Sequence, residues 1–156
     1  MATIAESIQN IEQLQQNLIV IFQETITENE EYIKKLQQRQ LDKGVDIFDL
    51  KLQHAYKTYP VYSKGYEKKK RKAGKYRGVV DLNFQGDYRK GITVEFENPE
   101  TAILQAPEAV VNGFNLSEGL RKWYGYFEGL TKDHLDSTID YLKSIFLKKC
   151  RDILKL

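Results

Sequence analysis

The sequence predicts an α+β protein with a long N-terminal helix, a small antiparallel β-meander and an amphipathic C-terminal helix. Apolar residues at three- and four-residue steps near both ends of the chain predict the two helices, and alternating apolar residues between them predict the strands. The chain has 156 residues, of which 41% are hydrophobic, so it is long enough for one domain with one core. We therefore treat residues 1–156 as a single domain.

The long helix is predicted over residues 3–41, inside a first segment, 1–43, that stops before Gly44. Thr3 and Glu6 have the spacing of a capping box. A helix of about 38 residues is roughly 57 Å long, which exceeds the diameter of a small domain. Part of it must project, bend or pack on another subunit, and the polar run 25–31 is the expected break. The apolar residues that recur along one face of this predicted helix are Ile4, Ile8, Ile11, Leu14, Leu18, Phe22, Ile26, Ile33 and Leu36.

Residues 44–78 are predicted to form an extended, mostly irregular basic arm, because they show no sustained period and are rich in tyrosine and lysine. Residues 51–80 carry ten Lys or Arg and one Asp or Glu (net +9), whereas residues 1–50 carry four and nine (net −5) and residues 81–156 carry ten and twelve (net −2). A loop of roughly 30 residues is uncommon inside a compact domain. We expect this arm to gain order from neighbouring chains.

The last segment, 79–156, is predicted to hold the meander and the C-terminal helices. Alternating apolar residues predict strands over 80–84 and 92–96, separated by a turn at Gly86-Asp87, and a third strand at 101–106. Residues 116–124 predict a short helix, and Thr131 is a suitable N-cap for the terminal helix. The apolar face of that helix consists of Leu135, Ile139, Leu142, Phe146, Cys150 and Ile153.

No pattern in the chain indicates a catalytic site, so we expect neither an enzyme nor a bound cofactor, metal or small-molecule substrate. His54 and His134 are far apart and lack a partner at metal-ligand spacing. Cys150 is the one cysteine, and a buried structural role is predicted for it. No apolar run reaches the roughly 18 residues of a spanning helix, and the first residues do not resemble a secretory signal. We therefore expect no membrane segment.

The basic stretch contains candidate contacts with DNA or with a neighbouring subunit. Tyr66 and Tyr76 stand beside the basic residues and offer stacking faces, a combination that single-strand or non-specific nucleic-acid binders use. A solvated or intersubunit role is the open alternative. The basic residues are Lys64, Lys68, Lys69, Lys70, Arg71, Lys72, Lys75 and Arg77. A second candidate set is aromatic, and we expect its residues to pack in the core, with an intermolecular interface as the alternative. It consists of Trp123, Tyr124, Tyr126 and Phe127.

Three segments in order carry a resemblance to a known family: QLDKGVD (40–46), VDLNFQGDY (80–88) and LRKWYGYFEGLT (120–131). With the final amphipathic helix, they resemble small virion proteins of tailed bacteriophages, of the type found in phages of Bacteroidetes hosts. The family pattern has a "vDL..tGdf" hairpin followed by an "L..kYG..iFGLt" segment. The resemblance covers residues 36–154. Gln85 departs from it where Thr is usual, and residues 47–51 replace a glycine-containing turn.

The resemblance implies a structural virion protein of the phage neck, a head–tail connector or tail-completion component that assembles as a ring around the DNA channel. It implies as partners further copies of the chain and other neck, portal or tail proteins. It places the protein in the virion, after synthesis in the host bacterial cytoplasm, with non-specific contact to genomic DNA through the basic arm. The alternative is a non-specific nucleic-acid-binding protein that uses the basic segment 64–77.

Overall fold

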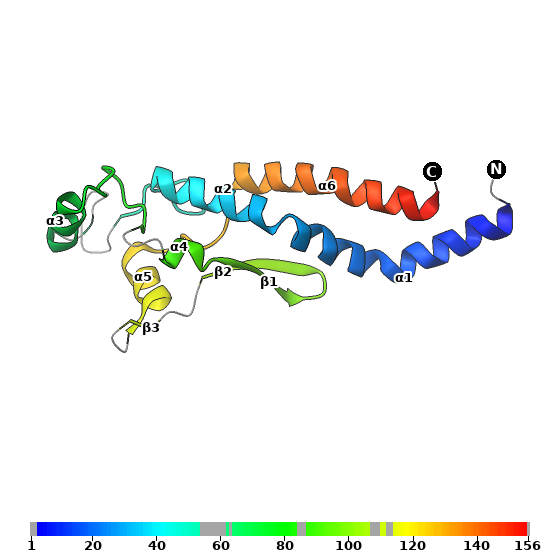
Figure 1. Ribbon diagram of the computed structural model, residues 1–156, viewed down its shortest axis with the longest axis horizontal. Helices are drawn as coiled ribbons and strands as arrows, with labels where there is room; N and C mark the ends of the chain where they lie inside the picture. The colour runs from blue at the N-terminus through cyan, green and yellow to red at the C-terminus, as the bar shows by residue number, and fades with distance from the viewer. Residues whose placement is uncertain are drawn as a thin grey trace.

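The computed structural model describes residues 3–53, 62, 64–83, 87–106, 110–111 and 114–155. Two long helical elements run side by side along the molecule, a β-hairpin lies against their middle, and the shorter elements gather at one end (Figure 1). We call the other end, where both termini lie, the stalk. The mixed α+β architecture with long terminal helices is therefore confirmed.

The N-terminal helix forms as α1 (Ile4–Glu28) and α2 (Glu30–Lys43), with the break at Asn29 inside the predicted polar run. The capping box is present: the backbone N–H of Glu6 donates to Thr3 Oγ1 at 3.2 Å and the backbone N–H of Thr3 donates to Glu6 Oε2 at 2.6 Å. Gly44 ends α2 in the left-handed conformation at φ +66°. These sequence predictions are confirmed.

The C-terminal helix α6 (Lys132–Leu154) runs antiparallel to α1 (Figure 1). Thr131 caps it by accepting from the backbone N–H of His134, as predicted. Charge holds the helices together near the break, where Lys149 Nζ lies 2.9 Å from Glu28 Oε1. Cys150 is buried in this contact region, which confirms its predicted packing role.

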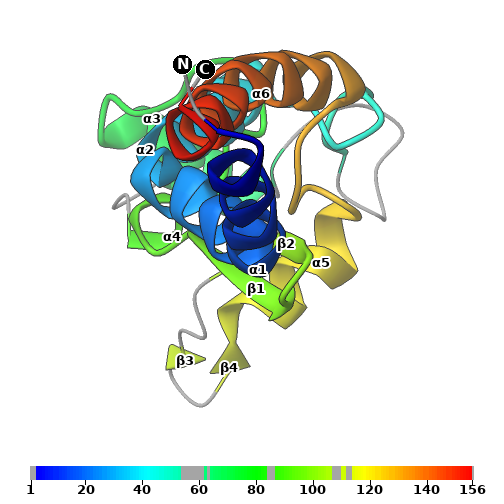
Figure 2. The same ribbon diagram turned by 90° about the vertical axis from the view of Figure 1, so that its right-hand side faces the viewer.

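The sheet is a two-stranded antiparallel hairpin of β1 (Thr93–Asn98) and β2 (Thr101–Gln105), with Val94 opposite Leu104. It packs on α1, where the rings of Phe22 and Phe96 lie 6.3 Å apart. In the end-on view α1 lies between α6 and the hairpin (Figure 2). A second short pair consists of β3 (Val110–Val111) and β4 (Phe114–Asn115).

The strand predicted over residues 80–84 is not present in the described part, residues 80–83. Val80, Asp81 and Leu82 are all buried in succession, and Leu82 has a φ of +48°, which is incompatible with an extended strand. Phe84 and Gly86 lie outside the described residues, and Asp87 begins the short helix α4 (Asp87–Lys90) instead of a turn. The meander is therefore a hairpin preceded by a buried irregular segment.

The basic arm is also more regular than predicted. Residues Lys64–Lys72 form helix α3 at the end of the molecule opposite the stalk (Figure 1). His54 lies outside the described residues. The remaining element, α5 (Leu116–Tyr124), forms where a short helix was predicted. The hydrophobic core lies at the α3 end and consists of Leu41, Leu52, Tyr62, Val80, Leu82, Tyr88, Ile92, Ala106, Tyr124 and Phe127.

Candidate functional site

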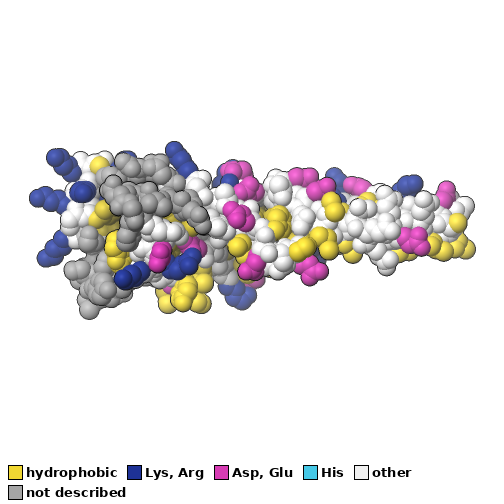
Figure 3. Space-filling model, turned by 90° about the horizontal axis from the view of Figure 1, so that it is seen from below, with side chains coloured by type: hydrophobic (Ala, Val, Ile, Leu, Met, Phe, Trp, Pro, Cys, Tyr) yellow, Lys and Arg dark blue, Asp and Glu magenta, His cyan; other side chains and the backbone are white. Residues whose placement is uncertain are grey.

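Of the predicted basic residues, Lys70 is buried and the other seven are exposed. Five lysines, Lys64, Lys68, Lys69, Lys72 and Lys75, are exposed on or just after α3, and we call them the basic tip. Figure 3 shows Lys and Arg side chains projecting at this end of the molecule. Several positive charges close together attract anions, and the basic tip is the strongest such feature on the surface that the structure describes.

Lys70, which was predicted to contact DNA or another subunit, is fully buried. Its ammonium forms an ion pair with Asp81 and donates to the carbonyl oxygen of Asn83 at 2.8 Å. The Tyr62 hydroxyl donates to Asp81 Oδ1 at 2.7 Å, and burial, followed by this carboxylate, raises the pKa of Tyr62 well above its ordinary value. Lys70 therefore belongs to the interior of the chain and is not part of its surface.

Two further basic residues are exposed and form ion pairs with carboxylates of their own chain. Arg71 pairs with Glu67 at 2.8 Å and lies over the ring of Tyr76, 4.0 Å from its centroid. Arg77 pairs with Asp42 at 2.8 Å. Tyr66 is half-buried against the core, so neither tyrosine presents a free stacking face. The exposed part of the predicted nucleic-acid site therefore consists of the basic tip together with Arg71 and Arg77.

The aromatic set splits into two pairs. Tyr124 and Phe127 belong to the core, and burial raises the pKa of Tyr124 to about 12. Trp123 and Tyr126 are exposed by 37% and 67%. The preference for core packing holds for one pair, and only Trp123 and Tyr126 are placed where a partner can reach them.

The segment 125–131 is fixed by two buried glutamines of α2 that the sequence did not single out. Gln37 Nε2 donates to the carbonyl oxygen of Phe127 at 2.6 Å. Gln40 accepts from the backbone N–H of Thr131 at 2.7 Å and donates to the carbonyl oxygen of Gly129 at 3.2 Å. The sequence shows that the two glutamines are three residues apart on one face of α2, which indicates that they lie on the same side of the helix. It does not show which backbone groups they bind.

The two longer motifs of the phage resemblance meet at Glu128. Its carboxylate pairs with Arg121, accepts from Ser117 Oγ at 2.7 Å and accepts from the Tyr88 hydroxyl at 3.2 Å. The ring of Tyr88 also lies 5.8 Å from that of Phe127. Burial, and then Glu128, raises the pKa of Tyr88 above its ordinary value. These contacts therefore join Tyr88, and Ser117 and Arg121 of α5, to the 125–131 segment.

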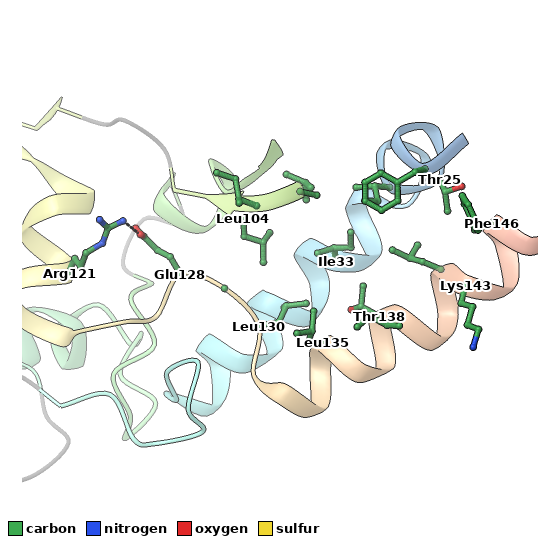
Figure 4. Close-up of a pocket in the computed structure, with 18 residues that line it drawn as sticks. Thr25, Ile33, Leu104, Arg121, Glu128, Leu130, Leu135, Thr138, Lys143 and Phe146 are labelled. Carbon is green, nitrogen blue, oxygen red and sulfur yellow. Dashed lines mark hydrogen bonds and ion pairs between the residues drawn. The ribbon is translucent and has the colours of Figure 1, made fainter. Parts of the chain in front are cut away.

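Beside this cluster lies an open apolar groove with a volume of about 800 Å³ (Figure 4). Its floor is Phe22, Ile26 and Ile33 of α1 and α2, and one wall is the hairpin, including Leu104. The opposite wall is α6, where Leu135 and Ile139 remain 47% and 52% exposed. Arg121 and Glu128 lie at one end of this groove and Lys143 lies on its α6 side (Figure 4). The predicted apolar face of α6 is therefore only partly covered by its own chain.

A second uncovered apolar surface lies on α1 in the stalk, and we call it the α1 stripe. It consists of Ile4, Ile8, Ile11 and Leu18, which are 82%, 53%, 49% and 40% exposed. Hydrophobic side chains are visible along the stalk in Figure 3. These residues were predicted to lie on one apolar face, and on that face the described chain partly covers Leu14 and Phe22 and buries Ile26.

Among the described residues, no group of three or more His, Cys, Asp or Glu is placed to hold a metal ion, and no helix is long and apolar enough to span a bilayer. Comparison of the chain with protein-family models, with curated proteins and with solved structures gave no match.

Proposed function

We propose that this chain is a structural virion subunit of a tailed phage, a neck component of the head–tail connector or tail-completion type that assembles as a ring around the DNA channel. The observation that carries the assembly part of this proposal is the uncovered apolar surface formed by the α1 stripe and the apolar groove. The phage neck itself enters through the motif resemblance.

Large exposed apolar patches on a soluble protein mark interaction sites, because burying them releases water from apolar surface. Here the α1 stripe lies at the opposite end of the molecule from the basic tip (Figure 1), so two regions remain for different partners. Copies that associate head to tail close into a ring when the rotation between them allows it. In such a ring the basic tip supplies charge that can face DNA without reading its sequence.

The test is the mass of the purified chain by light scattering over a range of concentrations, at 50 and 500 mM salt, followed by electron microscopy of the assembled fraction. A closed oligomer that survives high salt, with a central hole in the images, is expected because apolar contacts are not screened. A chain that stays monomeric at every concentration would overturn the proposal.

A second function, non-specific nucleic-acid binding, is favoured by the five exposed lysines of the basic tip. If each neutralises one phosphate, the logarithm of the binding constant for a duplex falls by at most about 4.5 per tenfold rise in salt. Replacing Lys68, Lys69 and Lys72 by Ser is expected to remove more than half of that slope, while the exposed Lys148→Ser on α6 serves as the control. Assembly that persists in the triple variant separates this function from the first.

A further inference from the structure

We propose that the apolar groove of one copy binds the α1 stripe of a second copy, so that residues 4–18 of the neighbour lie between the hairpin and α6. This inference rests on the proposed self-assembly and names its contact. It accounts for both uncovered surfaces with one partner, whereas packing stripe against stripe leaves the groove open.

The stripe has the form that a groove between elements requires. Ile4, Ile8, Ile11 and Leu18 recur at steps of four, three and seven residues, the anchor pattern of an amphipathic helix that binds in an apolar groove. The same face continues into Phe22 and Ile26, which form the groove floor and already pack under the hairpin in their own chain. The hairpin side of the fold thus already accepts this helix face.

The stripe of a chain cannot enter its own groove. Ile8 precedes Ile26 by eighteen residues of continuous helix α1, which separates them by about 27 Å at 1.5 Å per residue. Since Ile26 and Ile139 line the same groove, a contact between the stripe and Ile139 requires a second molecule.

Charge also favours α1 of a second copy as the occupant. Residues 3–33 contain no Lys or Arg, and Glu12 lies one turn after Ile8 beside the stripe. Lys143 lines the groove and makes no ion pair with any residue that the structure describes. Within one chain, Lys149 of α6 already pairs with glutamates of α1. The same pairing between an α6 lysine and an α1 glutamate is available between copies.

The area of the contact predicts a closed assembly. A fifteen-residue stripe is about 22 Å long and about 12 Å wide, a third of the helix circumference, so one contact buries about 500 Å² over both partners. Stable interfaces exceed about 1,000 Å². A copy that uses both its stripe and its groove takes part in two such contacts, which together bury about 1,000 Å², and every copy does so only when the assembly closes.

The test compares two double variants built at exposed positions with good helix formers: the stripe variant Ile8→Gln/Ile11→Gln and the groove variant Leu135→Gln/Ile139→Gln. The matched control is Leu50→Gln. Leu50 is 63% exposed and belongs to neither the α1 stripe nor the groove. Both double variants are expected to weaken assembly at least tenfold by light scattering, with unchanged circular dichroism, and the control is expected to assemble as the parent does. If the groove variant assembles normally, this inference is overturned while the proposed function survives. A parent chain that is monomeric overturns both.

A cross-link provides a readout that does not depend on loss of assembly. In a Cys150→Ala background, protein carrying Ile8→Cys is mixed with protein carrying Ile139→Cys and treated with a short bismaleimide. Cross-linked dimers are expected in the mixture, and none when Leu50→Cys replaces Ile139→Cys. Dimers from Ile8→Cys alone would show that stripes pack on stripes, and an uncross-linked mixture would likewise contradict the proposed contact.

Discussion

Replacing the buried Lys70 by Met is expected to lower the free energy of unfolding by about 3 kcal/mol. The substitution keeps an unbranched side chain one atom shorter than that of lysine but leaves the Asp81 carboxylate buried without its cation. The Tyr62 hydroxyl and the Asn83 carbonyl oxygen also lose their contacts with the ammonium.

The magnitude follows from what remains at Asp81. Removing one member of a buried ion pair costs about 3–5 kcal/mol, because the other charge stays in a medium of low dielectric constant. Asp81 keeps two donors, the Tyr62 hydroxyl at 2.7 Å and the backbone N–H of Asn83 at 3.1 Å. These bonds still stabilise the carboxylate, so the expected loss lies at the lower end of that range.

Urea unfolding measures this loss. With an m value of about 2 kcal/mol per molar urea, the midpoint of Lys70→Met is expected about 1.5 M below that of the parent. The neighbouring exposed Lys69→Met is the control, and its change is expected to stay within about 0.5 kcal/mol. The double variant Lys70→Met/Asp81→Asn should lose less than the sum of the two single variants, because it leaves no unpaired charge. Equal midpoints for Lys70→Met and Lys69→Met would refute the buried pair.

Two further perturbations test other parts of the fold. Gly129→Ala is expected to destabilise the chain by about 1–3 kcal/mol in thermal unfolding, since Gly129 has φ +124° and an added Cβ would lie 3.2 Å from Ile47 Cγ2. The control is Gly65→Ala in α3, where an added Cβ would meet no atom within 4 Å, and this variant should gain up to about 1 kcal/mol of stability. Equal effects of the two substitutions would contradict the assigned backbone conformations. Burial lowers the pKa of His134, with Lys43 and Arg39 acting the same way and Asp133 and Asp49 opposing them. The unfolded chain therefore binds a proton first as the pH falls through about 6.5, so the stability of the parent should drop between pH 7.5 and 5.5. The stability of His134→Gln should drop less over the same range. Identical changes in melting temperature for the two proteins would argue against this coupling.

Helix ends were predictable because their signals are local. Thr3, Gly44 and Thr131 each act on backbone groups within a few residues, so the printed sequence contains both partners of each interaction. The break at Asn29 followed from the weakening of the apolar stripe in the same way. The hairpin strands β1 and β2 also followed from local alternation and from the Asn98-Pro99 turn.

The errors have one common cause, which is contact between residues distant in sequence. Alternation placed Asp81 on a solvated strand face, whereas the structure turns it inward to meet Lys70, eleven residues earlier. The basic run showed no apolar period, so α3 was missed: the residue that faces the core at the end of that helix is a lysine, Lys70. A buried lysine is rare enough that residue type alone argues against it.

The candidate site was predictable to a similar degree. The stripe of α1 was visible from spacing alone, and its length correctly implied a part that projects from the core. The groove was not visible, because its walls come from β2 and α6, which the sequence separates by more than 25 residues. Of the predicted basic contact residues, the structure removes Lys70 from the surface, whereas Arg71 and Arg77 form ion pairs with their own chain but remain exposed.

The way each end of the molecule is stabilised bears on its role. At the α3 end, buried polar groups such as Gln40 and Asp81 are hydrogen-bonded to specific partners, which makes that end self-sufficient and unique in shape. The stalk relies on one helix pair and leaves the α1 stripe in water, an unfavourable arrangement for an isolated chain. A sequence that retains this cost in one region while pairing buried polar groups such as Gln40 and Asp81 in another is consistent with a partner that removes the cost. A second copy meets that requirement, since each chain carries both the stripe and a groove of matching chemistry.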